Sequence, residues 1–304
     1  MTTQSEMDKL IQRYMNHLSD SVSDKTKDDY KSDLEVFKDY LESQGLKIKN
    51  VTLENLENYA EYLRTKPVKR GKETQIGYAP STRSRMLQLV KYLFEYLNGI
   101  KYVAENPSVM LKLPKIPDRQ PVYLDLYQAK LLLEVVDKER NEFLRLRDKA
   151  MLLTFLTHGL RVEEMANMKI SDIKDDKLSV IGKGDKERVL ILTSNVLKAI
   201  DEYLNIRFDV DTDYLFLSTR RKQIHKRTIQ ATVDKYLNNA GLMEYSTHKL
   251  RSTAATLMSD QGVQISDIQE ILGHKDIATT KIYVDTSTVK KEQIAQKMND
   301  LFAN

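Results

Sequence analysis

The stretch from Thr157 to Glu164 reads THGLRVEE and joins two segments of helical character. The apolar run before it, from Met151 to Leu156, is typical of a buried helix, and Gly159 is a residue type that ends helices. The two acids that follow Arg161 suit the first turn of another helix, because they oppose the positive end of its dipole. The sequence therefore predicts a helix, a glycine break and a new helix that begins near Arg161.

Arg161 itself is unfavourable at such a helix start, by roughly 0.3–1 kcal/mol, unless an anion lies nearby. One explanation is an ion pair with an acid of its own helix, such as Glu164. The other is a phosphate held near the helix end, at which the arginine points. On this segment alone, the ion pair is the better explanation.

A second stretch, STHKLR from Ser246 to Arg251, begins another helix. Ser246 or Thr247 is expected to cap it with a side-chain hydroxyl. His248 and Arg251 stand three residues apart, so their side chains project from one face of the first turn. A phosphate cradle and a plain solvated basic turn explain this pair equally well.

A third stretch, EILGHKD from Glu270 to Asp276, ends a helix at Gly273 and places His274 in a tight turn. Asp276 then caps a short helix that carries Tyr283 near its end. Taken singly, a tyrosine among 16 is most often part of a core, and a lone histidine is most often structural.

The first third of the chain is predicted to be helical, with three amphipathic segments at residues 26–41, 53–63 and 81–99. Their apolar stripes are expected to form a helix-bundle core: Tyr30, Leu34, Phe37 and Leu41; Leu56, Tyr59, Ala60 and Leu63; Leu87, Val90, Phe94 and Leu97. Three prolines between Pro114 and Pro121 then interrupt the helical pattern and predict an extended linker.

Between the second and third of these helices, residues 64–82 read as a solvated loop that is rich in cations and holds one acid, Glu73. The alternative to plain solvation is contact with the DNA backbone, which two arginines at the next helix start would also favour. The residues predicted to contact DNA are Lys69, Arg70, Lys72, Arg83 and Arg85.

The remainder of the chain is mostly helical, with one exception. In KLSVIGKGDKERVLIL, from Lys177 to Leu192, two β-rich runs flank a glycine-containing turn and predict a β-hairpin. The turn is not a nucleotide-binding loop, because such a loop has a further glycine at a fixed spacing before its lysine and a Ser or Thr after it, and the turn has neither.

Bulk properties narrow the class of protein. With 304 residues the chain is expected to form two domains, and its net charge of +4 says little about partners. It contains no cysteine, no stretch long enough to span a membrane and no secretory signal, which favours a cytoplasmic protein that does not bind a membrane. With five histidines that lack ligand spacing, we expect no metal and no cofactor.

Taken together, the three stretches resemble the tyrosine recombinase (phage integrase) family. The resemblance rests on Arg161, His248-x-x-Arg251, Leu272-Gly273-His274 and Tyr283 in that order, with nine residues from His274 to Tyr283. In compactness the chain is most similar to Xer-type recombinases and to the integrases and resolvases of mobile elements. One departure is Ser252 directly after Arg251, where many relatives have His.

The resemblance implies a mainly α fold with a small β-hairpin or sheet. It also implies a helical core-binding domain over residues 1–113, an interdomain linker over 114–122 and a catalytic domain over 123–304. The hairpin would supply a further catalytic position at Lys183, with Lys186 as a competitor for the same role.

The implied chemistry is DNA cleavage through a 3′-phosphotyrosine. Tyrosine has a pKa near 10, so only about one in a thousand is ionised at pH 7, a deficit of roughly 4 kcal/mol. Arg161 and Arg251 would favour the phenolate of Tyr283 and stabilise the charge on the pentavalent phosphate. Lys183 would protonate the leaving 5′-oxygen, His248 would assist proton movement at the nucleophile, and His274 would bond a non-bridging oxygen.

The implied partner is double-stranded DNA with an inverted-repeat core site, bound by a homo-tetramer on two DNA sites or by a tetramer with a related recombinase. The terminal segment 290–302 carries an apolar face that would dock on a neighbouring protomer or on its own domain: Ile294, Met298, Leu301 and Phe302.

Two other functions remain open at this point. A type IB topoisomerase-like relaxing enzyme is disfavoured by the helical first domain and the terminal helix. A catalytically silent DNA-binding protein is disfavoured because all six catalytic positions are occupied. Integration and the resolution of chromosomes, plasmids or transposons are not distinguished.

Overall fold

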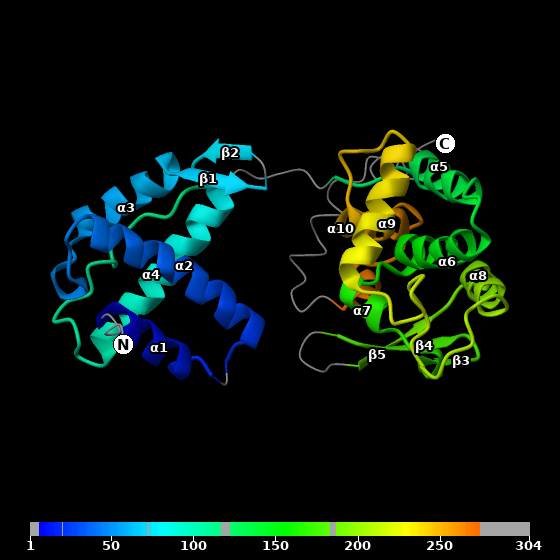
Figure 1. Cartoon of the computed structure of the whole chain (residues 1–304), viewed down its shortest axis with the longest axis horizontal. Helices are drawn as coiled ribbons and strands as arrows, with labels where there is room; N and C mark the ends of the chain where they lie inside the picture. The colour runs from blue at the N-terminus through cyan, green and yellow to red at the C-terminus, as the bar shows by residue number, and fades with distance from the viewer. Residues whose placement is uncertain (1–5, 20, 72, 117–121, 183–186, 274–304) are drawn as a thin grey trace, which may run out of the picture. The chain divides into compact units, whose positions relative to one another are not determined.

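The computed structural model describes residues 6–19, 21–71, 73–116, 122–182 and 187–273. Contacts between residues divide the chain into two compact units, Met1–Asp118 and Arg119–Asn304. Figure 1 shows a helical first unit and a second unit in which helices accompany a small sheet. Within the described ranges, no helix is long and apolar enough to cross a membrane.

The first unit is built from four α-helices and a two-stranded hairpin within its described residues. The helices are α1 (Glu6–His17), α2 (Asp24–Ser43), α3 (Leu53–Thr65) and α4 (Pro80–Gly99), with a 3₁₀ turn η1 (Ile48–Asn50) before α3. Side chains fix two of the helix starts: Ser23 accepts a hydrogen bond from Thr26 N–H, and Thr52 forms a reciprocal capping box with Asn55.

The apolar stripes predicted for this unit form its core. Leu34, Phe37, Tyr59 and Leu63 are fully buried, as are all four stripe residues of α4. Tyr30 and Ala60 pack at the edge of this cluster as partly buried residues. Aromatic rings pack against one another within it, for example Phe37 and Tyr59, whose centroids are 4.8 Å apart and whose planes are tilted by 58°. The prediction of a helix-bundle core is confirmed.

The prediction of a loop between α3 and α4 is wrong in part. Strands β1 (Pro67–Arg70) and β2 (Glu73–Ile76) pair as an antiparallel hairpin, with Arg70 opposite Glu73. Gly71 in the turn has φ of 60°, the left-handed conformation that two-residue hairpin turns require. The strands carry few apolar residues, and Ile76 is 82% exposed, so a hydrophobic pattern could not have announced them.

The second unit contains seven α-helices and three strands among its described residues. They are α5 (Leu126–Asp137), α6 (Glu142–His158), α7 (Val162–Asn167), η2 (Ile170–Asp172), β3 (Ile173–Lys174), β4 (Lys177–Ile181), β5 (Glu187–Ile191), α8 (Ser194–Leu204), α9 (Lys226–Asn239), α10 (Thr247–Asp260) and α11 (Ile265–Leu272). Helix α6 is central and packs against α5, α8 and α10.

The predicted hairpin is confirmed as β4 and β5, and β3 adds a third antiparallel strand in the order β3-β4-β5. Leu178 pairs with Leu190, and both face the core together with Val180. Alternate residues on the other face, such as Val189, are exposed. The two-residue alternation places one face of the sheet on the helices.

Candidate active site

The glycine break between α6 and α7 lies against the end of α11. Gly159 ends α6 with φ of 59°, in the left-handed region where glycine is favoured. A Cβ on Gly159 would lie 2.5 Å from the Cδ2 atom of Leu272, so a larger residue would force the buried side chain of Leu272 to shift. The predicted junction is confirmed, and Arg161 is the residue at the start of α7.

Arg161 forms the ion pair that the sequence favoured. Its backbone N–H and its Nη1 each donate to the carboxylate of Glu164, at 2.8 Å in both cases. Glu164 is 5% exposed, whereas the side chain of Arg161 is 35% exposed. The arginine therefore keeps part of its side chain open to solvent while Glu164 holds its Nη1.

Glu164 also binds a second arginine, Arg188 of β5. Arg188 donates from Nη1 and Nη2 to the two carboxylate oxygens, at 3.0 and 2.9 Å. Burial alone would raise the pKa of Glu164, but the hydrogen bonds from Arg188 and Arg161 outweigh it and hold that pKa below its ordinary value. Glu164 is thus a fixed negative charge between two guanidinium groups.

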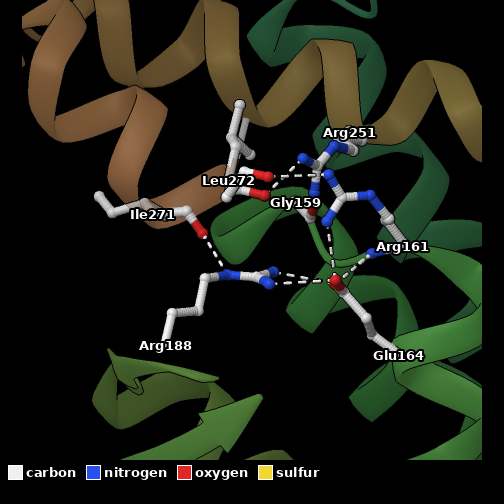
Figure 2. Close-up of polar contacts among 8 residues, drawn as sticks. Gly159, Arg161, Glu164, Arg188, Arg251, Ile271 and Leu272 are labelled. Carbon is white, nitrogen blue, oxygen red and sulfur yellow. Dashed lines mark hydrogen bonds and ion pairs between the residues drawn. The ribbon is translucent and has the colours of Figure 1, made fainter. Parts of the chain in front are cut away.

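Three successive carbonyls at the carboxyl end of α11, the last two of the helix and that of its C-cap residue Gly273, each accept a hydrogen bond from a different arginine. Arg188 Nε donates to Ile271 O at 2.9 Å, Arg251 Nη2 donates to Leu272 O, and Arg161 Nη2 donates to Gly273 O at 2.9 Å. Figure 2 shows the guanidinium groups gathered around this helix end. Carbonyls there lack helical partners and carry the negative end of the helix dipole, so cations are favoured.

Arg251 and His248 both come from the first turns of α10, as predicted. Arg251 is 4% exposed and its Nη1 donates to Gly159 O at 2.6 Å, which ties α10 to the glycine break. The side chain of His248 is exposed to solvent over part of its surface. Partial desolvation, followed by the charges of Arg251, Lys249 and Arg161, lowers the pKa of His248 below its ordinary value. The imidazole is therefore mainly neutral at pH 7.

The predicted cap of α10 is wrong in its chemistry. Ser246 does occupy the N-cap position, but its side chain makes no capping hydrogen bond. Thr247 is buried, and its hydroxyl finds no hydrogen-bond partner among the residues that the structure describes. Thr253, which follows the departure at Ser252, accepts a hydrogen bond from Leu124 N–H and so fastens the start of this unit to α10.

Arg188 is a residue of this cluster that the sequence pattern did not single out. Its signal was present in the alternation of β5, because Arg188 stands two residues before buried Leu190 and on the same face. A cation on the inward face of a strand requires an acid or an anion beside it. Glu164 is that acid.

A second group that the sequence prediction missed is the cationic run from residue 220 to 227, RRKQIHKR. It leads into α9, whose first turn contains no acid. The run lies beside α7, because Lys226 pairs with Glu163 at 2.5 Å and Gln223 Nε2 donates to Ala166 O at 3.0 Å. Its exposed members are Arg220, Arg221, Lys222, His225 and Arg227.

The predicted cations of the first unit have diverse surroundings. Lys69 is exposed on β1, and Arg85 pairs with the buried carboxylate of Asp33 at 2.8 Å. Burial raises the pKa of Asp33, which the charge of Arg85 opposes. Arg83 Nε is buried and makes no hydrogen bond to any described residue. Arg70 lies at the end of β1, and Lys72 is outside the described residues.

Four residues of the predicted chemistry also fall outside the described residues: Lys183, Lys186, His274 and Tyr283. The same holds for the terminal segment 290–302. Two tyrosines near the site in sequence are placed. Tyr236 is 1% exposed, its hydroxyl donates to Asp148 at 2.9 Å, and burial raises its pKa. The hydroxyl of Tyr245 donates to Gln128 at 3.2 Å. A buried phenol with a raised pKa is a poor nucleophile.

Within the described part of the chain, no group of three or more histidines or acids is arranged to hold a metal ion. His158 also lies near the glycine break and is buried. Its Nδ1 is hydrogen-bonded to Thr157, and its Nε2 is hydrogen-bonded to Ile191 O at 3.0 Å. Desolvation lowers its pKa. Its position joins α6 to β5 and is structural.

Comparison with known proteins gives two family matches. Residues 123–289 match the phage integrase family, and residues 11–99 match the phage integrase N-terminal SAM-like domain. The tyrosine recombinase XerC of Caldanaerobacter subterraneus is 42% identical over 70% of this chain and 62% of its own length. XerD of Vibrio vulnificus is 30% identical over 90% of this chain and 88% of its own.

Two solved structures share the fold at lower identity. XerH bound to a palindromic difH substrate, in a post-cleavage complex, is 21% identical with a TM-score of 0.71 over 97% of this chain and 90% of that one. A lambda integrase tetramer bound to a Holliday junction is 18% identical with a TM-score of 0.72 over 94% of this chain and 79% of that one.

Proposed function

This chain belongs to the phage integrase family, as a tyrosine recombinase of the Xer type that cleaves and rejoins DNA, and we propose that Tyr283 is its nucleophile. The observation that carries the proposal is that Arg161 and Arg251 meet at the carboxyl end of α11, with His248 close enough to both for their charges to lower its pKa. These residues come from two widely separated parts of the sequence. His274 directly follows the helix end at which they meet.

In the proposed reaction, the oxygen of Tyr283 attacks the scissile phosphorus and its proton passes to His248. The lowered pKa of His248 supports this role, because a neutral imidazole can accept a proton at pH 7. The 5′-oxygen leaves with a proton from Lys183, and a 3′-phosphotyrosine remains. Attack by a 5′-hydroxyl then reverses these steps and rejoins the strand.

The arginines supply the electrostatic part of the proposed mechanism. A guanidinium binds two phosphate oxygens at once, and its charge offsets the charge that develops in the transition state. Arg161 presents more surface to solvent than Arg251, so we assign it the more direct phosphate contact. One phosphodiester is exchanged for another of similar energy, so the proposal requires no nucleotide, metal or cofactor.

We further propose that the DNA backbone follows cations on both units. In the first unit these are Lys69, Arg70, Lys72, Arg83 and Arg85, and the second unit adds the run from residue 220 to 227. In this proposal, residues 1–113 form the domain that binds the core site, residues 114–122 form the interdomain linker, and residues 123–304 form the catalytic domain. The run beside α7 would extend phosphate contact outward from Arg161.

We propose a homo-tetramer on two DNA sites as the active assembly, each site an inverted repeat. A tetramer is present in the lambda integrase complex, and a palindromic substrate in the XerH complex. The segment 290–302 would dock its apolar face on a neighbouring protomer. We place the enzyme in the cytoplasm, at the nucleoid.

The test of the proposal is Tyr283→Phe on a nicked suicide substrate, from which the cleaved strand cannot be rejoined. The wild-type protein should form a covalent adduct that survives denaturing electrophoresis, with and without EDTA. The variant should bind the same DNA in a gel shift and form no adduct, because only the attacking oxygen is removed. Tyr245→Phe serves as the matched control and should retain the adduct.

An adduct in Tyr283→Phe would move the nucleophile to another residue. A strict need for Mg²⁺ in cleavage would contradict the metal-free mechanism. Absence of an adduct with the wild-type protein on every inverted-repeat substrate would favour a silent DNA-binding protein.

A further inference from the structure

Arg188 is an arginine of the cluster that the proposed mechanism leaves without a role. It lies on β5, inside the second unit, and its side chain is 10% exposed. Each of its three guanidinium nitrogens has a protein partner: Nε has Ile271 O, and the two terminal nitrogens have Glu164. A guanidinium so enclosed presents little surface to a DNA phosphate.

Arg188 and Arg161 share one partner, Glu164, and bind different carbonyls at the same helix end. Glu164 accepts from both arginines, with Oε1 shared between Arg161 Nη1 and Arg188 Nη1. The carboxyl end of α11 likewise accepts from both, Ile271 O from Arg188 and Gly273 O from Arg161. The contacts of Arg188 and Arg161 are therefore linked twice, once through an acid and once through a helix end (Figure 2).

From this double linkage we infer that Arg188 is a positioning residue for cleavage, which acts on Arg161 through Glu164 and the last turn of α11. The inference rests on the proposed role of Arg161. Without Arg188, Glu164 would lose two of the hydrogen bonds that hold it in place and Ile271 O would lose its partner. The acid could then swing toward Arg161 and take up the donors that a phosphate needs.

The close approach of backbone to Arg188 supports a fixed geometry. A Cβ on Gly273 would lie 3.1 Å from Nη1 of Arg188 and 3.3 Å from its Cδ, so the glycine leaves room for the guanidinium to pass under the helix end. The same glycine adopts φ of 66° to end α11. Arg188 thus occupies the space that the glycine opens.

The predicted effect is on the chemical step rather than on DNA binding. Arg188→Gln should slow single-turnover cleavage at saturating DNA by about tenfold or more, since small displacements of a phosphate-binding group cost large factors in rate. Its Kd for the site should change by less than about threefold, because the enclosed guanidinium of Arg188 offers little surface to DNA. Arg188→Lys should recover part of the rate by reaching Glu164 alone.

A double-mutant cycle with Arg161→Ala separates positioning from general stability. If Arg188 acts through Arg161, its loss has little left to harm once Arg161 is gone, so the double variant should cleave within about threefold of Arg161→Ala. If Arg188 only stabilises the fold, the two defects multiply. A merely structural role would not produce this saturation.

Arg207→Gln is the matched structural control. Arg207 also satisfies backbone carbonyls, those of Leu215, Phe208, Thr212 and Tyr214, and none of these residues belongs to the cluster. At a temperature at which all variants are folded by circular dichroism, Arg207→Gln should cleave at the wild-type rate, because the loss of buried hydrogen bonds to backbone carbonyls elsewhere in the unit does not disturb Arg161.

Three outcomes are decisive. A wild-type cleavage rate for Arg188→Gln would overturn the inference, and so would a multiplicative double variant. Should Arg188→Gln fail to fold, the same cycle is run with Arg188→Lys, under the same criteria. Normal cleavage by Arg161→Ala would instead refute the proposed function of Arg161, which is a different failure.

Discussion

Two buried ion clusters of the second unit differ in what their arginines leave exposed. In the first, which we call the α6 pair, Arg147 binds Asp148 at 2.7 Å, and the two side chains are 3% and 2% exposed. In the second, Glu164 is similarly buried, yet the side chain of Arg161 remains 35% exposed. The first cluster is closed by protein, and the second opens to solvent at one arginine.

The partners of the α6 pair explain its closure. Arg147 Nη1 donates to Leu217 O at 3.0 Å, Tyr236 donates to Asp148 at 2.9 Å, and the ring of Phe143 covers the guanidinium with its centroid 5.4 Å from the central carbon. Each of these interactions stabilises the fold. Burial and charge alone therefore do not mark a functional site, and the proposed role of Arg161 rests on the surface that this arginine keeps open to solvent.

The largest expected effect contrasts Arg161→Ala with Arg147→Ala. Arg161→Ala should reduce cleavage of a suicide substrate by about 100-fold or more, the scale expected when a transition-state interaction is removed, with a modest loss of binding. Arg147→Ala should instead cost about 3–5 kcal/mol of unfolding free energy, because it leaves Asp148 buried without its cation. Urea unfolding and single-turnover cleavage, measured on both variants, test the contrast.

Arg251→Ala sharpens this contrast, since Arg251 shares features of both clusters. It is 4% exposed and bonds two carbonyls, so its loss should lower both stability and cleavage. If Arg161→Ala proved as unstable as Arg147→Ala while binding and cleavage fell equally, Arg161 would be an anchor of the fold and not a catalytic residue.

The difference between the clusters also shows what a sequence can reveal. The break at Gly159, the stripes of α2, α3 and α4, and the β4–β5 hairpin depend on neighbours in sequence, and their patterns predicted them. The hydrogen bonds at the end of α11 depend on tertiary placement: Arg188 and Ile271 are 83 residues apart, and Arg161 and Gly273 are 112 apart. Periodicity alone cannot supply such contacts.

Glu164 illustrates the limit at a single residue. The sequence offered an ion pair or a phosphate as the explanation of Arg161, as though one excluded the other. The structure contains the ion pair, and the exposed remainder of the same side chain still suits a phosphate. The hairpin β1–β2 was missed for another reason, because its strands are polar and exposed and leave no hydrophobic pattern.

An effect on DNA binding of intermediate size is expected at the outer cations, away from both clusters. Charge reversal at Lys69 and Arg70, or at Arg220 and Arg227, should weaken binding and flatten its salt dependence, by about 0.9 in slope for each DNA phosphate that the protein no longer neutralises. Cleavage at saturating DNA should stay near wild type, unlike that of Arg161→Ala. Gel shifts over a series of salt concentrations give the slopes, and an unchanged slope would remove that surface from the DNA interface.

The smallest expected effect is a pH dependence of stability with opposite signs in the two clusters. Burial raises the pKa of Asp148 above its ordinary value of 3.8, against the opposing effect of Arg147. The hydrogen bonds from Arg188 and Arg161 overcome the burial of Glu164 and lower its pKa below 4.5. A carboxyl group whose pKa is lowered by folding adds stability above its unfolded-state pKa, and that stability is lost as pH falls through the folded-state pKa. A carboxyl group whose pKa is raised by folding adds stability below its unfolded-state pKa, and that stability is lost as pH rises through the folded-state pKa.

Each acid can be replaced by its neutral amide, as Glu164→Gln and Asp148→Asn. As pH falls, the difference in unfolding free energy between wild type and each variant should change in opposite directions. The stability advantage of wild type over Glu164→Gln should shrink as pH falls below about 4.5, because the carboxylate that two arginines stabilise becomes protonated. Its advantage over Asp148→Asn should grow as pH falls toward about 3.8, because protonation relieves a buried charge. Urea unfolding of the three proteins between about pH 3 and pH 6 gives both differences. Parallel pH profiles would mean that Glu164 is held no differently from Asp148, and the distinction between an open and a closed cluster would then rest on exposure alone.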